Sequence, residues 1–98
     1  MLRLIRSAQS DEDLIAIWQY IATVGKDPDA TDRLLREIDR RIELFARYPH
    51  IGEAQQQFGE RTRRIIVGNY LVFYDVLDDA VHVLRVYHSA RRLEDLFD

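Results

Sequence analysis

The side chains best suited to chemistry gather near the C-terminal end of the chain, in the stretch RVYHSARR. This stretch holds Arg85, Tyr87, His88 and Arg91, and Arg64 lies in an earlier basic segment. A histidine can titrate near neutral pH and arginines pair with phosphate, so Arg64, Arg85, Tyr87 and His88 could cleave RNA by general acid–base catalysis. The same residue types would serve equally well to bind an acidic peptide. Their spacing does not separate the two uses.

Other site chemistries find little support in the sequence. The histidines are His50, His82 and His88, and none lies at ligand spacing from another, so no metal site is predicted. His88 and Ser89 are neighbours in an extended segment and should point to opposite sides, so Ser89 is expected to cap a final helix. The chain has no nucleophile elbow, phosphate-binding loop or dinucleotide fingerprint. We therefore expect no cofactor.

Length and charge limit the remaining possibilities. The 98 residues predict one domain, residues 1–98, and the absence of cysteine excludes disulfides. The net charge of −3 argues against direct DNA binding. Thirteen arginines stand against a single lysine, which reflects either codon composition or a use for bidentate pairing. With no signal peptide and no run of about 20 apolar residues, we expect a cytoplasmic protein without membrane association.

Hydrophobic periodicity predicts a helix hairpin after a short first strand at residues 2–7. Ser10 and Asp13 form a capping box that indicates the start of the first helix, and Gly25 is expected to end it. The second helix should start at Asp27-Pro28 and stop before Pro49, because a proline disfavours helical geometry in the residue ahead of it. Residues 48–60 are expected to form a loop.

From residue 61 onward the pattern is that of strands. Three segments rich in β-branched and aromatic residues, at 61–67, 70–77 and 80–88, are separated by turn residues, and the tail returns to helical spacing. The predicted order is β-α-α-β-β-β with a short C-terminal helix. This gives an α+β, two-layer fold with the helix hairpin packed on an antiparallel sheet.

Both faces of the segment 70–77 are apolar, although the helix hairpin can cover only one. Tyr70, Val72 and Tyr74 point one way, and we expect them on the face that the helices leave uncovered. In the last strand, Leu84 and Val86 are expected to face the helices, while Val83, Arg85 and Tyr87 join the uncovered face. Arg85 among aromatic side chains is either part of a binding surface or an arginine lying over the rim of the sheet.

Four segments carry a resemblance to a known family. DLIAIWQYIA, LFARYPHIG, NYLVFYDV and VLRVYHSAR occur in this order, and together they resemble the ParE branch of the RelE/ParE toxin superfamily. Members of this superfamily are toxins of bacterial type II toxin–antitoxin modules, often described as plasmid stabilisation proteins. Many ParE-like chains read HGARD where this chain reads HSARR. The resemblance implies a RelE/ParE-like fold and growth inhibition.

The resemblance also implies partners. It suggests a cognate, ParD-like antitoxin that covers the exposed sheet, and DNA gyrase as the target of a toxin that is not an enzyme. The alternative is a RelE-like, ribosome-dependent mRNA endonuclease; a third possibility is a decayed toxin kept as an antitoxin-binding module. The residues expected to bind the antitoxin are Tyr70, Val72, Tyr74, Arg85, Tyr87 and Arg91.

Overall fold

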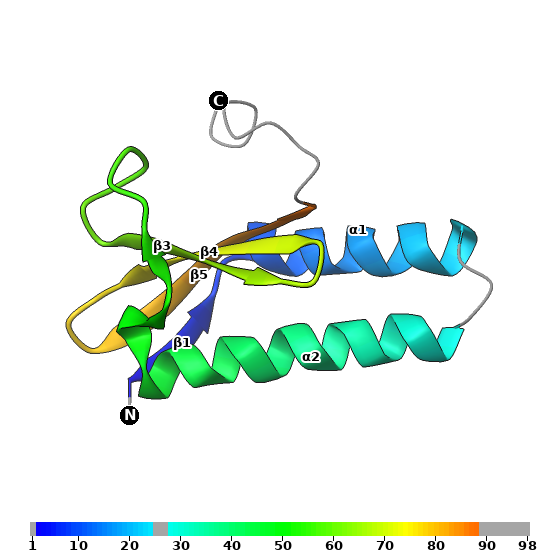
Figure 1. Cartoon of the computed structure of the whole chain (residues 1–98), viewed down its shortest axis with the longest axis horizontal. Helices are drawn as coiled ribbons and strands as arrows, with labels where there is room; N and C mark the ends of the chain where they lie inside the picture. The colour runs from blue at the N-terminus through cyan, green and yellow to red at the C-terminus, as the bar shows by residue number, and fades with distance from the viewer. Residues whose placement is uncertain (1, 25–27, 89–98) are drawn as a thin grey trace.

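The chain folds into a five-stranded sheet with two helices packed against it. This is a computed structural model that describes residues 2–24 and 28–88, and Figure 1 shows α2 beneath the sheet and α1 alongside β5. The sheet order is β1-β5-β4-β3-β2, with β1 parallel to β5 and the other pairs antiparallel. The elements are β1 (Arg3–Arg6), α1 (Ala8–Val24), α2 (Pro28–Arg47), a 3-10 helix (Pro49–Ile51), β2 (Glu53–Ala54), β3 (Thr62–Val67), β4 (Tyr70–Val76) and β5 (Ala80–His88).

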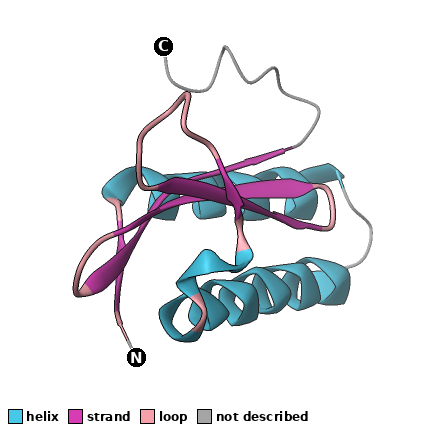
Figure 2. Ribbon diagram, turned by 60° about the vertical axis from the view of Figure 1, so that its left-hand side comes forward, coloured by secondary structure: helices cyan, strands magenta, loops and turns pink. Residues whose placement is uncertain are grey.

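This architecture confirms the predicted fold class and the order of the elements. The helix hairpin, the strand meander and the end of α2 before Pro49 all lie where periodicity placed them. Figure 2 shows α2 as a layer below the sheet, with the strands passing in front of α1. The expected loop 48–60 contains the 3-10 helix and β2. The expected C-terminal helix and its cap Ser89 lie outside the described residues, and within those residues no helix is long and apolar enough to cross a membrane.

Helix α1 starts earlier than the capping box predicted. Ser7 is its cap, because the backbone N–H of Ser10 donates to the Ser7 hydroxyl oxygen at 2.9 Å. Ser10 is fully buried inside the first turn, and its own hydroxyl donates to the Ser7 carbonyl. The prediction of Ser10 as the cap was therefore wrong. Asp13 therefore does not cap the helix, and its carboxylate contacts Arg85 and Val86 of β5 instead.

The core lies between the sheet and the helices. Helix α2 contributes Ile38, Ile42 and Phe45, each with no exposed surface. The sheet contributes Tyr70, Val72 and Tyr74 of β4, which are buried against these helix residues. Their expected place on the uncovered face was wrong. Both faces of β4 are apolar, so alternation alone could not indicate which of them the helices cover.

A β-bulge explains why Val83 and Leu84 of β5 lie on the opposite faces to those expected. Phe73 is opposite Arg85 and Tyr74 is opposite Val83, so β5 has one more residue than β4 at this point. The extra residue, Leu84, shifts the alternation of β5. Val83 and Val86 therefore both face the helices, as was expected only for Val86, whereas Leu84 packs on the other side. A strict period of two cannot anticipate such a shift.

Candidate functional site

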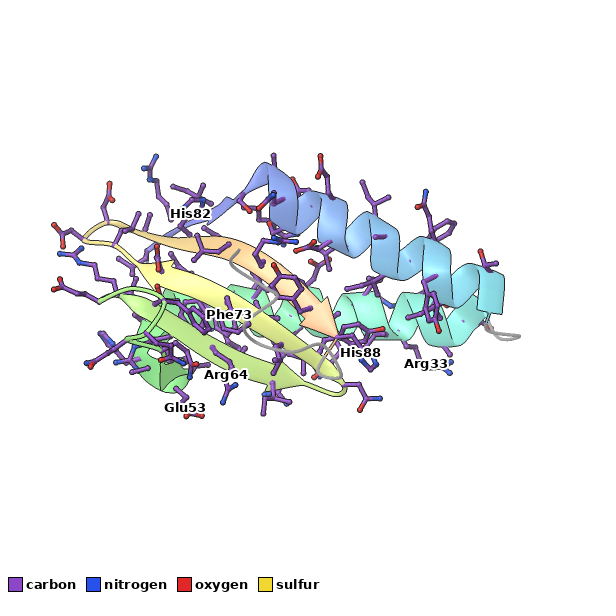
Figure 3. The ribbon with its side chains drawn as sticks, turned by 90° about the horizontal axis from the view of Figure 1, so that it is seen from above. Arg33, Glu53, Arg64, Phe73, His82 and His88 are labelled. Atoms are coloured by element: carbon purple, nitrogen blue, oxygen red, sulfur yellow. The ribbon has the colours of Figure 1, made fainter. Side chains whose placement is uncertain are left out.

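The side of the sheet turned away from α2, here called the outer face, carries most of the chemically distinctive residues. Side chains directly opposite one another on paired strands lie on the same face, so the register of β2 to β5 defines the set. Figure 3 looks onto this face and shows Phe73 near its middle, with Arg64 on the neighbouring strand. The outer face includes Glu53, Arg64, Ile66, Leu71, Phe73, Arg85 and Tyr87.

An aromatic cluster forms the centre of the outer face. Leu71, Phe73 and Tyr87 are buried together, and Phe58 from the loop before β3 packs against them. The rings of Phe58 and Phe73 meet edge to face at 5.7 Å, and those of Phe73 and Tyr87 at 6.2 Å. Beside this cluster, Ile66 of β3 keeps 58% of its surface exposed. The outer face thus continues from a packed centre into an accessible apolar margin.

Arg64 lies on one flank of Phe73. Its terminal Nη2 pairs with the Glu53 carboxylate at 3.2 Å, while its Nε is buried and has no hydrogen-bond partner among the described residues. Only 20% of the Arg64 side chain is exposed. Burying a guanidinium nitrogen without an acceptor costs free energy. The Arg64 Nε is therefore a buried donor without an acceptor among the described residues.

Arg85 lies on the other flank and is held more firmly. Its Nε and Nη2 donate to the two carboxylate oxygens of Asp13 on α1, at 2.9 and 3.0 Å. The same carboxylate accepts the backbone N–H of Val86 at 2.9 Å, and the guanidinium lies 4.4 Å from the centre of the Tyr87 ring. The hydrogen bond to Asp13 raises the pKa of Arg85. Arg85 was expected either to belong to a binding surface or to lie over the rim of the sheet. Its contacts show that it is held by Asp13 of α1 and lies over the Tyr87 ring.

His88 does not join this group. It is opposite Tyr70 and packs edge to face on the Tyr70 ring at 5.3 Å, so it lies on the helix side of the sheet. There it lines a groove of about 540 Å³ between α1 and the end of β5, together with Asp13, Tyr20 and Tyr87. Of the four residues considered for RNA cleavage, Tyr87 and His88 therefore line this groove, whereas Arg64 and Arg85 do not.

The predicted antitoxin-binding residues are also divided. Arg85 and Tyr87 lie on the outer face as expected, Tyr70, Val72 and Tyr74 are in the core, and Arg91 lies outside the described residues. Sequence reasoning missed Phe58, Ile66 and Asp13 as parts or supports of this surface. Ile66 could have been identified from the hairpin turn at Gly68-Asn69, which fixes its register opposite Leu71. No cluster of three metal-ligating side chains occurs in the described residues.

The sequence is similar to a known protein family and to a known toxin. Residues 4–93 match the family described as the ParE toxin of type II toxin–antitoxin systems. The chain is 33% identical over 88 residues to Toxin ParE1 of Caulobacter vibrioides, covering 90% of this chain and 88% of that protein.

Solved structures agree on the fold. A chain of the chromosomal ParDE system from P. aeruginosa superposes with a TM-score of 0.76 at 14% identity, covering 90% of this chain and 96% of that one. A copper-bound mutant toxin from Helicobacter pylori gives 0.60 at 20% identity, covering 99% and 100% of the two chains.

Proposed function

The chain belongs to the ParE toxin family of type II toxin–antitoxin systems, and from this premise we propose that it inhibits DNA gyrase and is neutralised by a cognate antitoxin bound to its outer face. The composition of the outer face is the observation that supports neutralisation by a bound antitoxin. It combines an exposed apolar residue, Ile66, with two flanking guanidinium groups, those of Arg64 and Arg85. Arginine side chains are enriched at protein interfaces.

The geometry favours a binding surface over an RNA-cleaving site. Arg64 and Arg85 already pair with the carboxylates of Glu53 and Asp13, which a phosphate would have to displace. Tyr87 is only 4% exposed, and the groove that it shares with His88 is not lined by Arg64 or Arg85. General acid–base cleavage needs an acid and a base within reach of the same phosphate. We therefore place the mRNA endonuclease second to the gyrase inhibitor.

The antitoxin surface can be tested with one exposed residue. Ile66→Asp should leave the fold intact, because Ile66 is exposed, but should bring a carboxylate into an apolar contact and weaken antitoxin binding at least about tenfold. The measurement is isothermal titration with the small protein encoded by the reading frame next to this gene. Ile15→Asp on α1, where Ile15 is 57% exposed, is the matched control. Equal affinities of both variants and the wild type would argue against the outer face.

The target is tested separately. Expression of the chain alone should stop growth, and purified protein at micromolar concentration should inhibit DNA supercoiling by gyrase while leaving transcripts intact in a translation extract. Unaffected supercoiling would contradict the gyrase assignment. Codon-positioned cuts that disappear in Arg85→Ala or His88→Ala would instead support the endonuclease. If the chain is harmless but still binds the antitoxin tightly, it acts only as a binding module.

A further inference from the structure

Besides the outer face, the sheet offers a second surface at its β1 edge. In the described residues β1 ends the sheet, with β5 on one side and no strand on the other. The amides of Arg3 and Ser7 donate to the Asp79 and Val83 carbonyls, at 3.1 and 2.9 Å. Because the backbone groups of a strand alternate in direction, the N–H and C=O groups of Leu4 and Arg6 point toward the outer edge. They can therefore pair with another strand.

The rest of the sheet boundary is less available. Where β5 extends beyond β1, the Ser7 hydroxyl donates to the Leu84 carbonyl at 2.7 Å and the Asp13 carboxylate accepts the Val86 amide. Side chains from the start of α1 thus satisfy this part of the β5 edge. At the opposite boundary, β2 is only two residues long. Along β1, the groups of Leu4 and Arg6 have no backbone partner among the described residues.

A groove runs along this edge. It has a volume of about 590 Å³ and lies between β1 and the C-terminal half of α2. The Leu2 amide donates to the Ala46 carbonyl at 2.9 Å and fixes the two elements at one end of the groove. Its apolar lining is formed by Leu2, Leu4, Leu44 and Ala46, and its charged rim by Arg3, Arg40, Arg47 and Glu43.

The rim has an uneven charge. Three guanidinium groups face one carboxylate, although the whole chain carries a net charge of −3. Arg40 and Arg3 pair with Glu37 and Asp79, but 72% of each arginine side chain remains exposed. A cationic rim over an apolar floor complements a segment that alternates acidic and apolar residues.

We propose that the β1 edge and this groove bind an extended segment of the antitoxin that alternates acidic and apolar residues, added to the sheet as a further strand beside β1. The inference rests on the proposed neutralisation by an antitoxin and adds to it a second contact, distinct from the outer face. The backbone groups of Leu4 and Arg6 would supply the hydrogen bonds. The groove would supply apolar contacts, and its arginines would make binding selective for acidic side chains.

Hydrogen exchange tests the backbone part. In the purified complex with the antitoxin from the adjoining reading frame, the Leu4 and Arg6 amides should exchange at least about tenfold more slowly than in the free toxin. Unchanged exchange at these amides in a complex that forms would overturn the proposal. Failure to form any complex would instead contradict the proposed neutralisation, so the two failures are distinguishable.

Charge reversal tests the groove. Arg47→Glu should weaken antitoxin binding about tenfold, because it brings a like charge against the acidic segment. Arg36→Glu is the matched control: Arg36 is exposed on the same helix but lies about 16 Å along its axis from Arg47 and does not line the groove. Equal effects of the two variants would show only a general response to net charge and would overturn the assignment of the groove.

Discussion

At the scale of single residues, Tyr74 shows how one polar group organises a loop against the core. Its hydroxyl donates to the Pro49 carbonyl and accepts the Gly52 amide, both at 2.9 Å. Its ring stacks on Phe45 with centroids 4.1 Å apart. Burial raises the pKa of Tyr74 above its ordinary value of 10. The loop that leads from α2 to the sheet is therefore anchored by a neutral phenol.

This pKa shift predicts a dependence of stability on alkaline pH. A raised pKa in the folded state means that the unfolded chain loses this proton first, so the stabilisation is complete below pH 10 and is lost as pH rises through the folded-state pKa. Urea unfolding should show a free energy of unfolding that falls above pH 10. In Tyr74→Phe this fall should be shallower, although Tyr70, whose pKa is also raised by burial, keeps part of it. Identical slopes for the two proteins would contradict the assignment to Tyr74.

Gly52 is the partner that makes the Tyr74 contact possible. A Cβ at this position would lie 2.3 Å from the Tyr74 hydroxyl oxygen and 2.8 Å from the Arg64 carbonyl. Gly52→Ala should therefore destabilise the protein by about 1–3 kcal/mol, as overpacking does. In the Tyr74→Phe background the hydroxyl is gone and the cost should be smaller by about 1 kcal/mol. Strictly additive costs in urea unfolding would rule out this clash.

At the scale of the elements, periodicity predicted what exists and where it ends. The apolar stripe that includes Ile38, Ile42 and Phe45 indicated α2 because a period near 3.6 sums over many residues. Proline and glycine supplied the stops. Such local signals suffice for the helix hairpin, the three long strands and the fold class.

What the sequence left open depends on contacts between distant residues. Ser7 and Ser10 are both good caps, and Ser7 becomes the cap in a structure where its hydroxyl also reaches the Leu84 carbonyl. The bulge at Leu84 reverses the alternation along β5. Asp13 and Arg85 are separated by 72 residues, and no spacing rule links them. The tyrosines of β4 were expected on the wrong face because both faces of that strand are apolar. The candidate site was therefore predicted only for Arg64, Arg85 and Tyr87.

The Asp13 carboxylate joins α1 to β5 and gives the prediction at this scale. Asp13→Ala would leave the Arg85 guanidinium, whose side chain is 22% exposed, and the Val86 amide without an acceptor. We expect a loss of about 2–4 kcal/mol in the free energy of unfolding. Asp78→Ala, which removes the exposed pair with Arg61, should cost no more than about 1 kcal/mol. Similar losses for both variants would show that the Asp13 contact is not special.

At the scale of the whole molecule, the chain has a small core and no cross-link. A domain of this size buries only roughly 60–65% of the surface that its unfolded chain exposes, and it has no cysteine to form a disulfide. Some of its apolar surface also remains accessible, on the outer face at Ile66 and in the groove beside β1. Both features favour a protein whose stability depends on a bound partner. The proposed antitoxin contacts would cover both surfaces.

Partner binding should therefore raise the melting temperature of the toxin. A ligand present at 100 times its dissociation constant stabilises the native state by about 2.7 kcal/mol. For a domain of this size that corresponds to a rise in Tm of roughly 10–20 °C. Calorimetry at increasing antitoxin concentration should show this rise, and at equal concentration Arg47→Glu and Ile66→Asp should each reduce it, whereas Arg36→Glu should not. A Tm independent of antitoxin concentration would mean that the partner does not bind the folded toxin.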